Sequence, residues 1–187
     1  MSISVLDMSV SLDGYIADPD DFLGGDDGER LHKWADVDGP PSGPVKQFEE
    51  EWSAAGAVLA GRRTAELMDH WGGSHAGLPI IVPSHRPPGP AARWGYPLVT
   101  YVTDGIESAM AQAKAAAQGK DVMVHGATTA QRALEAGVLD ELQIHLVPVL
   151  FGEGRRLFDL LPSRIELEIV RVIDTPEATH IRYRVRR

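Results

Sequence analysis

In two short stretches, a glycine is followed by side chains that can bind an anion, and each stretch begins an expected helix. In "GRRT", Gly61 ends the apolar segment Ala57–Gly61, and Arg62, Arg63 and Thr64 follow. The first helical turn exposes unpaired N–H groups and carries partial positive charge, so each arginine there costs about 0.3–1 kcal/mol. A bound anion would reverse this cost, because N–H groups, guanidinium groups and a hydroxyl would converge on one phosphate. The alternative is that both arginines turn outward to Asp or Glu.

In the second stretch, "HGATT", a glycine again lies between an apolar segment and an expected helix, but no arginine follows it. The apolar segment Asp121–His125 is followed by four small residues, Gly126, Ala127, Thr128 and Thr129. The glycine permits a close backbone approach, and either threonine can cap the helix expected over Thr128–Ala136. No acidic residue lies in its first turn, and Gly137 follows where a left-handed C-terminal residue belongs. A plain strand–turn–helix explains the same residues. Two such helix starts after parallel strands of one sheet favour a dinucleotide, whose pyrophosphate and 2′-phosphate can use both.

Two further groups of residues are candidates for chemistry or binding. Ser84 and His85, in "VPSHR", follow an apolar segment and suit an anion, or they lie in a solvated loop. In "SLDGYIAD", Asp13 and Tyr15 lie beside a turn, where Asp13 contacts substrate, supplies a proton or simply makes the turn. No G-x-G-x-x-G, P-loop or H-E-x-x-H pattern occurs, and we expect no bound metal.

Composition excludes several function classes. The chain has 187 residues and no cysteine, which suits one domain over 1–187 and rules out thiol chemistry. Its net charge is −9 with no dense basic run, so nucleic acid is not an expected partner. No signal peptide and no apolar run long enough to cross a membrane are recognisable, so we expect a cytoplasmic protein with no membrane partner.

Hydrophobic patterning predicts alternating strands and helices. Strands are expected at Ser2–Ser11, Ala57–Gly61, Leu78–Ser84, Leu98–Thr103, Asp121–His125 and Leu142–Leu150. Helices are expected at Val45–Ala55, Arg62–Trp71, Ile106–Gln118 and Thr128–Ala136, with Glu49, Glu50 and Glu51 facing outward. The tail alternates with period two and predicts a hairpin around Asp174–Ala178. The order predicts an α/β fold with a mainly parallel sheet, helices on both faces and a closing antiparallel hairpin.

One long segment falls outside this alternation. Residues 18–44 are dense in Asp, Gly and Pro and predict a long loop, with a short helix around Glu29–Trp34. Loops of this length inside a compact domain are usually functional or disordered. We expect this one, with Trp34, to close over a substrate and exclude water.

Taken together, three motifs resemble the dihydrofolate reductase-like superfamily. They are "SLDGYIAD", "LAGRRTAELM" with a following Trp, and "VHGATTAQRALEAGVLDELQIHLVPVLFGEGRRLF". More narrowly, the chain resembles the reductase domain of bacterial riboflavin biosynthesis, which is the C-terminal domain of the bifunctional deaminase-reductase. The resemblance implies a three-layer α/β fold with a mixed, mostly parallel central sheet, and NADPH as cofactor. It also implies a homodimer.

Cofactor contacts transfer from the family by position. Ala17 would offer its backbone to the nicotinamide carboxamide. The phosphates on the adenosine side would fall to Gly61, Arg62, Arg63 and Thr64. Ser84 and His85 would lie near the adenosine ribose and its 2′-phosphate. The pyrophosphate would contact Gly126, Ala127, Thr128 and Thr129.

The substrate half departs from the family pattern. The riboflavin reductases usually show Glu-Gly-Gly where this chain has His125-Gly126-Ala127, and that Glu helps hold their pyrimidine substrate. They often carry Lys or Arg where this chain has Tyr15, so few cations are expected there for a phosphoribosyl group. Asp13, Tyr15, Trp34 and His125 remain the candidates for substrate contact.

These features predict an enzyme that transfers hydride from NADPH to a C=N or C=O bond of a small heterocycle. The nearest named activity is 5-amino-6-(5-phosphoribosylamino)uracil reductase, with Asp13 as the candidate for substrate contact or proton delivery. One alternative is dihydrofolate reduction. Another is a nucleotide- or flavin-binding module without catalysis, which the departures at His125 and Tyr15 motivate.

Overall fold

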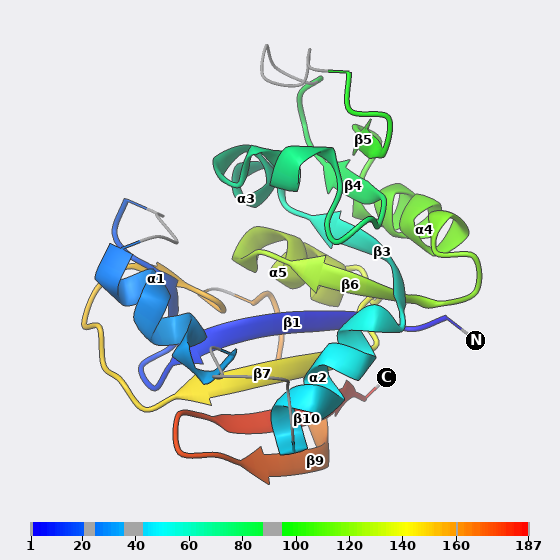
Figure 1. The fold of residues 1–187 in the computed structure, drawn as a ribbon. Coiled ribbons are helices and arrows are strands. Elements are labelled where there is room, and N and C mark those ends of the chain that lie inside the picture. The colour runs from blue at the N-terminus through cyan, green and yellow to red at the C-terminus, as the bar shows by residue number, and fades with distance from the viewer. Residues whose placement is uncertain (1, 21–24, 36–42, 88–94, 160, 187) are drawn as a thin grey trace. The chain divides into compact units, whose positions relative to one another are not determined.

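A computed structural model gives the fold of the chain (Figure 1). It describes residues 2–20, 25–35, 43–87, 95–159 and 161–186. The chain divides into two compact units. Unit 1 comprises Met1–Val5 and Ala54–Asp140, and unit 2 comprises Leu6–Ser53 and Glu141–Arg187.

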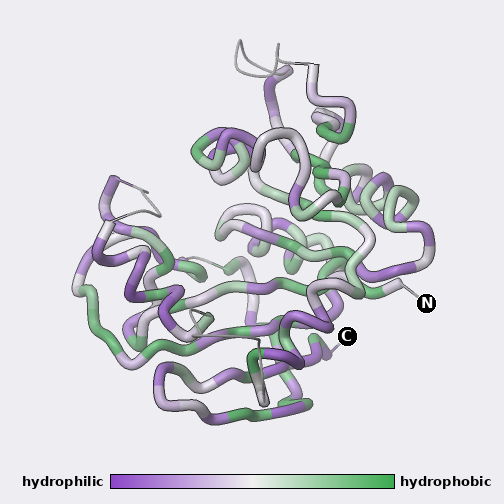
Figure 2. Tube along the Cα trace, in the orientation of Figure 1, coloured by the Kyte–Doolittle hydropathy of each residue, from purple (hydrophilic) through white to green (hydrophobic). Residues whose placement is uncertain are grey.

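Unit 1 is built on parallel strands. β3 (Ala55–Ala60), β4 (Ile80–Pro83), β5 (Val99–Val102) and β6 (Asp121–His125) lie in the order β5-β4-β3-β6. Each neighbouring pair is parallel, as predicted. The inner strands read as continuous apolar runs because both faces of a parallel sheet are covered, and Figure 2 shows these runs in green. Leu59 and Ile80 have no exposed surface.

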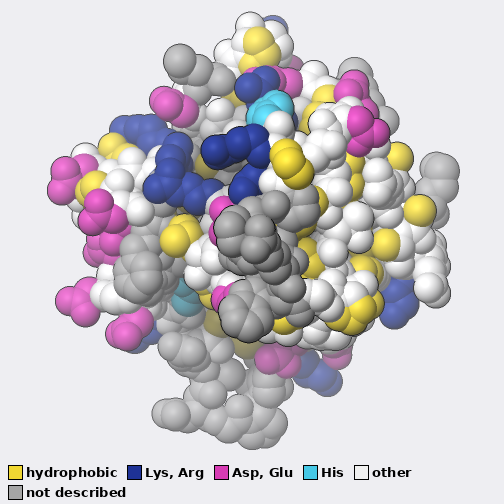
Figure 3. Space-filling view, turned by 90° about the horizontal axis from the view of Figure 1, so that it is seen from above, with side chains coloured by type: hydrophobic (Ala, Val, Ile, Leu, Met, Phe, Trp, Pro, Cys, Tyr) yellow, Lys and Arg dark blue, Asp and Glu magenta, His cyan; other side chains and the backbone are white. Residues whose placement is uncertain are grey.

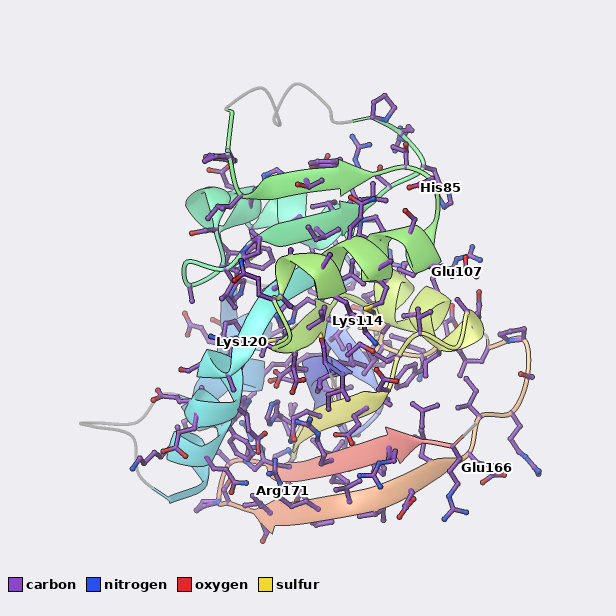
Figure 4. The ribbon with its side chains drawn as sticks, turned by 90° about the vertical axis from the view of Figure 1, so that its right-hand side faces the viewer. His85, Glu107, Lys114, Lys120, Glu166 and Arg171 are labelled. Atoms are coloured by element: carbon purple, nitrogen blue, oxygen red, sulfur yellow. The ribbon has the colours of Figure 1, made fainter. Side chains whose placement is uncertain are left out.

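The helices of unit 1 cover both faces of its strands. They are α3 (Arg62–Leu67), α4 (Ile106–Ala116) and α5 (Ala127–Glu135). Figures 1 and 4 show α4 and α5 on one face and α3 on the other. Ala109, Met110 and Ala113 form the buried stripe of α4, and their small size lets the helix lie close to the strands.

The helix predicted over Arg62–Trp71 is too long. It ends at Leu67, and a 3₁₀ segment, η2 (Asp69–Gly73), follows. Asp69, His70 and Trp71 have φ values of 43°, 51° and 50°, a left-handed conformation that no α-helix can contain. The turn buries the ring of His70, whose Nε2 lies 2.8 Å from the Tyr101 hydroxyl. Burial and this hydrogen bond offset the local backbone strain.

Unit 2 is mostly antiparallel. β1 (Ser4–Ser11), whose residues from Leu6 onward belong to this unit, is followed in the order β1-β7-β10-β9 by β7 (Glu141–Val147), β10 (Thr179–Val185) and β9 (Leu167–Asp174). β10 is antiparallel to both of its neighbours. The predicted hairpin is confirmed, and the Thr175 N–H donates to the Ala178 carbonyl across its turn at 3.0 Å.

A short two-stranded sheet in unit 2 was not predicted from the sequence. β2 (Tyr15–Ala17) pairs antiparallel with β8 (Arg155–Arg156). Neither segment is long enough to show a period of its own, so pattern reading gives no signal for it. The pairing fixes the turn at Asp13–Gly14 against the segment after β7, because the Leu157 N–H donates to the Gly14 carbonyl at 3.0 Å.

The 18–44 segment contains more helix than predicted. α1 (Gly25–His32) and a 3₁₀ turn, η1 (Lys33–Ala35), precede α2 (Gly43–Ser53). α1 begins four residues before the predicted helix because Gly28 and Leu31 are both buried and order the preceding turn. Residues 21–24 and 36–42 of the predicted loop lie outside the described part of the chain.

The expectation that Glu49, Glu50 and Glu51 all face outward is wrong for Glu51. Its carboxylate pairs with the guanidinium of Arg171 on β9 (Figure 4) and lies 3.4 Å from that of Arg182 on β10. Although burial by itself raises the pKa of Glu51, the hydrogen bond and charge of Arg171, with the charge of Arg182, bring it below its usual range. Helix α2 is therefore fastened to the antiparallel strands of unit 2 by charge as well as by Phe48.

We expect Glu51→Gln to lower the free energy of unfolding by about 1–3 kcal/mol at pH 7, because two half-buried guanidinium groups lose their counter-charge. A group whose pKa is lowered by folding stabilises above its ordinary pKa and loses this contribution as the pH falls. Urea unfolding at pH 7 and pH 3 should therefore show a difference that shrinks in acid. Glu49→Gln, on the exposed face of the same helix, is the control. Equal effects of the two variants would contradict the assignment.

Candidate functional site

The two glycine-led helix starts lie side by side in unit 1. β3 and β6 are adjacent parallel strands whose last paired residues are Ala60 and His125. The residues that follow, Gly61 and Gly126, therefore leave the sheet next to each other, and the Gly61 N–H donates to the His125 carbonyl at 3.1 Å. We call Gly61–Thr64 and Gly126–Thr129 the paired helix starts.

Each glycine of the paired helix starts faces a hydroxyl of the other. A Cβ at Gly61 would lie 2.6 Å from Thr129 Oγ1, and one at Gly126 would lie 2.9 Å from Thr64 Oγ1. Gly126 also has φ of 94°, which side chains rarely adopt. Both positions need glycine because the two backbones approach closely. The residue types predicted to bind an anion are thus brought together in space.

The predicted capping of α5 by Thr128 or Thr129 is wrong. The helix begins one residue earlier, at Ala127, so both threonines lie inside its first turn, and the residue before it is Gly126. Gly126 has no side chain to cap the first N–H groups, and no acidic residue lies in that turn. Such an end suits an anion. At the other end the expected left-handed residue is confirmed, since Gly137 has φ of 66° and donates to the Leu134 carbonyl.

Arg62 turns to an acid, the alternative left open by its sequence. Its Nε lies 2.7 Å from Glu66 Oε1, and its Nη1 donates to Ser84 Oγ at 3.1 Å and to the Arg86 carbonyl at 3.3 Å. Two of the predicted phosphate ligands, Arg62 and Ser84, are thereby joined across the ends of β3 and β4. Sequence reading missed Glu66, although its spacing of four residues from Arg62 is that of a helical ion pair.

The neighbouring candidates Arg63 and His85 are exposed. Figure 4 shows His85 at the surface beyond the end of β4. Figure 3 shows Lys, Arg and His side chains at the surface that it draws. An exposed cation such as Arg63 favours binding of a small anion locally, although the net charge of the chain is −9.

His125 belongs to a cluster of rings in unit 1. Its imidazole lies 5.5 Å from that of His75 at an interplanar angle of 25°, and 6.4 Å from the Trp71 ring. The left-handed turn of η2 brings Trp71 to this position. Contact between His125 and a substrate stays a prediction.

In unit 2, Asp13 holds a turn. Its carboxylate accepts from the Ser11 hydroxyl at 2.6 Å and from the backbone N–H groups of Gly152 and Phe151 at 2.7 and 3.2 Å. The Ser11 hydrogen bond, with those of the backbone, lowers the pKa of Asp13 to about 2. This geometry favours the turn over the role of proton source.

Tyr15 and Ala17, in β2, meet the arginines of β8. The Arg156 guanidinium lies 4.5 Å from the centre of the Tyr15 ring, and its Nη2 donates to the Tyr15 hydroxyl at 3.0 Å. The expectation of few cations at this position is therefore corrected, because strand pairing supplies an arginine that is distant in sequence. A Cβ at Gly154 would lie 2.2 Å from the Ala17 carbonyl oxygen, so this buried backbone is closely fitted to the "GEG" segment.

A sequence profile described as the RibD C-terminal domain matches residues 4–181. The chain belongs to this family. No curated protein matches the chain.

Solved structures similar to this RibD C-terminal domain share its fold. A Shewanella sp. PV-4 protein assigned to riboflavin biosynthesis has a TM-score of 0.78 and 23% identity over 99% of both chains. A dihydrofolate reductase from Enterococcus faecalis, complexed with NADP(H) and RAB-propyl, has a TM-score of 0.63 and 17% identity over 99% of this chain and 97% of its own. The fold is therefore the predicted α/β fold of the dihydrofolate reductase-like superfamily.

A larger relative contains this fold as one part. The diaminohydroxyphosphoribosylaminopyrimidine deaminase/5-amino-6-(5-phosphoribosylamino)uracil reductase of Thermotoga maritima has a TM-score of 0.63 and 15% identity. The match covers 98% of this chain and 56% of that protein. The RibD C-terminal domain described here therefore spans little more than half the length of the bifunctional protein.

A dinucleotide fits the paired helix starts of this RibD C-terminal domain on their own geometry. The glycines leave no side chain over the first turn of α5, and the hydroxyls of Thr64 and Thr129 stand beside the two backbones. Among the described residues, no group of three or more His, Asp and Glu is arranged to hold a metal. No helix in the described ranges is long and apolar enough to cross a membrane.

Trp34 packs inside unit 2. Its indole lies 4.0 Å from the His145 ring in a stacked arrangement, and its Nε1–H donates to Ser9 Oγ at 2.9 Å. Sequence reading missed His145 and Ser9 as partners of Trp34, because they lie on two strands far from it in the chain.

We expect Gly61→Ala to destabilise the protein by about 1–3 kcal/mol, because the new methyl group meets Thr129 Oγ1. Thr129→Ala removes that oxygen, so the double variant Gly61→Ala/Thr129→Ala should recover part of the loss. Urea unfolding of the four proteins measures the coupling. Strictly additive effects would show that the two helix starts are not in contact.

Proposed function

We propose that this protein is an NADPH-dependent reductase of a small heterocyclic substrate. The observation that carries the proposal is the pair of helix starts. Two uncapped, glycine-led turns in contact suit a pyrophosphate, whose charge is matched by backbone N–H groups and partial helix charges. Membership of the RibD C-terminal domain family and the reductases among the similar structures support the same activity.

Different residues of the chain would contact different parts of the cofactor. Gly126, Ala127, Thr128 and Thr129 take the pyrophosphate through backbone N–H groups and hydroxyls. Gly61, Arg62, Arg63 and Thr64 take the phosphates on the adenosine side, and Ser84 and His85 lie toward the 2′-phosphate. Ala17 contributes its backbone to the nicotinamide carboxamide. When bound, NADPH supplies the hydride, and the protein contributes orientation and electrostatics.

Unit 2 supports the proposed substrate class. Arg156 offers a cation beside Tyr15, which suits a phosphorylated substrate, and Arg155 precedes it in β8. Contact between Trp34 and the substrate stays a prediction, because its indole already stacks on the His145 ring. The nearest named reaction is reduction of 5-amino-6-(5-phosphoribosylamino)uracil, the activity printed for the Thermotoga relative.

Direct titration with NADPH tests the cofactor. We expect saturable binding at micromolar to millimolar concentration and oxidation of NADPH when the phosphoribosylamino-uracil is added. Absence of binding at millimolar NADPH would overturn the proposal.

Arg62→Ala tests the 2′-phosphate. We expect NADPH to bind about 10- to 150-fold more weakly, because a charge-assisted hydrogen bond is worth about 1.5–3 kcal/mol. NADH, which lacks this phosphate, should lose much less affinity. Arg132→Ala is the control, because Arg132 is an exposed arginine of α5 that pairs with Glu135. Equal losses for both dinucleotides would assign Arg62 to the fold through Glu66 and Ser84.

Two alternatives have distinct outcomes in the same assays. Tight NADPH binding without oxidation of NADPH by any pyrimidine or pterin would favour a nucleotide-binding module, which the replacement of the family's Glu by His125 motivates. Methotrexate-sensitive turnover of dihydrofolate would favour dihydrofolate reduction. Homodimer assembly and a cytoplasmic location stay predictions, and light scattering measures the first.

A further inference from the structure

The core of unit 2 contains an ionisable cluster formed by Asp7, His145 and His180. The two histidines are cross-strand partners on β7 and β10, and each is 1% exposed. Their Nδ1 atoms lie 2.6 Å apart, and His145 Nε2 lies 3.5 Å from Asp7 Oδ1 on β1. Burying two polar imidazoles costs free energy unless their nitrogens are hydrogen-bonded. The hydrogen bonds of the cluster therefore indicate which nitrogens carry protons.

The contacts define where protons can sit. Only one proton fits between the two Nδ1 atoms, so one ring donates and the other accepts. The Asp7 carboxylate favours a proton on His145 Nε2. At the far end, His180 Nε2 lies 3.2 Å from Thr175 Oγ1, and that hydroxyl donates to the Ala178 carbonyl at 2.8 Å. A lone pair of the Thr175 hydroxyl oxygen therefore accepts a hydrogen bond from the His180 Nε2–H.

This arrangement contains one proton more than two neutral rings. His180 carries its proton on Nε2, so the shared proton belongs to His145, which then has both nitrogens protonated opposite Asp7. Rotating the Thr175 hydroxyl toward His180 gives a second arrangement in which both rings are neutral. The cluster can therefore gain or lose one proton while its carbon, nitrogen and oxygen atoms keep their positions.

The surroundings decide which ring holds the charge. Burial, followed by the charge on His145, lowers the pKa of His180 to about 4. Asp7 and Asp174 act in the opposite sense on His180, and Arg171, itself paired with Glu51, adds to the lowering. His145 instead faces Asp7 and lies under the Trp34 ring, whose π face attracts a cation.

One end of the cluster reaches the surface. The Asp7 side chain is 18% exposed, whereas that of His145 is 1% exposed. Asp7 and Ser9 share one face of β1 because strand side chains alternate. Trp34 and Phe48 cover the rings, with Phe48 5.3 Å from His145, and keep bulk water from them.

Reduction of C=N or C=O needs a proton as well as a hydride. Asp13 is a poor source because its pKa is about 2 and its oxygens accept three hydrogen bonds within the turn. The Asp7 cluster can store one proton, and the carboxylate at its end is partly exposed, at 18%.

Resting on the proposed reductase function, we propose that Asp7 protonates the substrate heteroatom and that the His145–His180 pair resupplies Asp7. His145 Nε2 first passes its proton to the Asp7 carboxylate, 3.5 Å away. NADPH, when bound, would supply the hydride to the substrate carbon, and the π electrons of C=N or C=O would form a new bond from the heteroatom to the proton on Asp7, which returns to its carboxylate form. The imidazole pair, now neutral, takes one proton from solvent in each turnover.

Asp7→Asn tests this role in the full chain. With NADPH and the phosphoribosylamino-uracil, we expect kcat to fall about 100- to 10,000-fold with little change in NADPH affinity. His180→Gln should retain more activity and move the acidic side of the pH profile of kcat, since it alters the pair and leaves Asp7 in place. His70→Gln, a buried histidine of unit 1 bound to Tyr101, should leave the pH profile unchanged. Urea unfolding verifies that each variant is folded.

A measurement without turnover separates this inference from the proposed function. Proton and nitrogen NMR of the histidines should show a slowly exchanging proton between the two Nδ1 atoms. In Asp7→Asn the titration of the pair should move to lower pH, because the carboxylate no longer stabilises the cation. An unchanged titration, or full kcat in Asp7→Asn, would overturn the proposal. Failure of NADPH binding with a shifted titration would overturn the proposed function alone.

Discussion

The close approach of two backbones at the ends of β3 and β6 is the constraint on which the candidate site depends. Parallel pairing sets Ala60 opposite His125, so the next residues must leave the sheet in contact, as the hydrogen bond from the Gly61 N–H to the His125 carbonyl shows. Any side chain at Gly61 or Gly126 would displace a threonine hydroxyl of the other helix start. Glycine is required here by packing, and the resulting gap exposes backbone N–H groups that suit a phosphate.

In unit 2, several polar groups are packed among aromatic rings. Asp13 secures the turn before β2 with three accepted hydrogen bonds, and Arg156 closes over Tyr15. Deeper in the unit, His145 and His180 pair across two strands beneath Trp34. The contact between the two imidazoles ties β7 to β10, and the hydrogen bond from the Trp34 Nε1–H to Ser9 Oγ ties Trp34 to β1. The same arrangement leaves Asp7 at the accessible end of the network.

Much of the fold was readable from local pattern. The strand Asp121–His125 and the hairpin around Asp174–Ala178 were predicted because apolar runs and period-two alternation are properties of neighbouring residues. The helix over Arg62–Trp71 was too long, since its sequence continues a helical pattern while three left-handed residues end it. The strain of those residues is offset by burial of His70, which no local window reveals.

The sequence by itself determined the two helix starts, the order of elements and the family, because glycine, threonine and apolar periodicity report on local backbone geometry. Only the tertiary structure decided the partners. Glu51 lies on a helix whose neighbours are acidic and exposed, yet strands more than a hundred residues away bring Arg171 to it. Tyr15 and Arg156, and His145 and His180, meet in the same way. Cross-strand contacts depend on register and on which strands become neighbours, and a chain read one segment at a time contains neither.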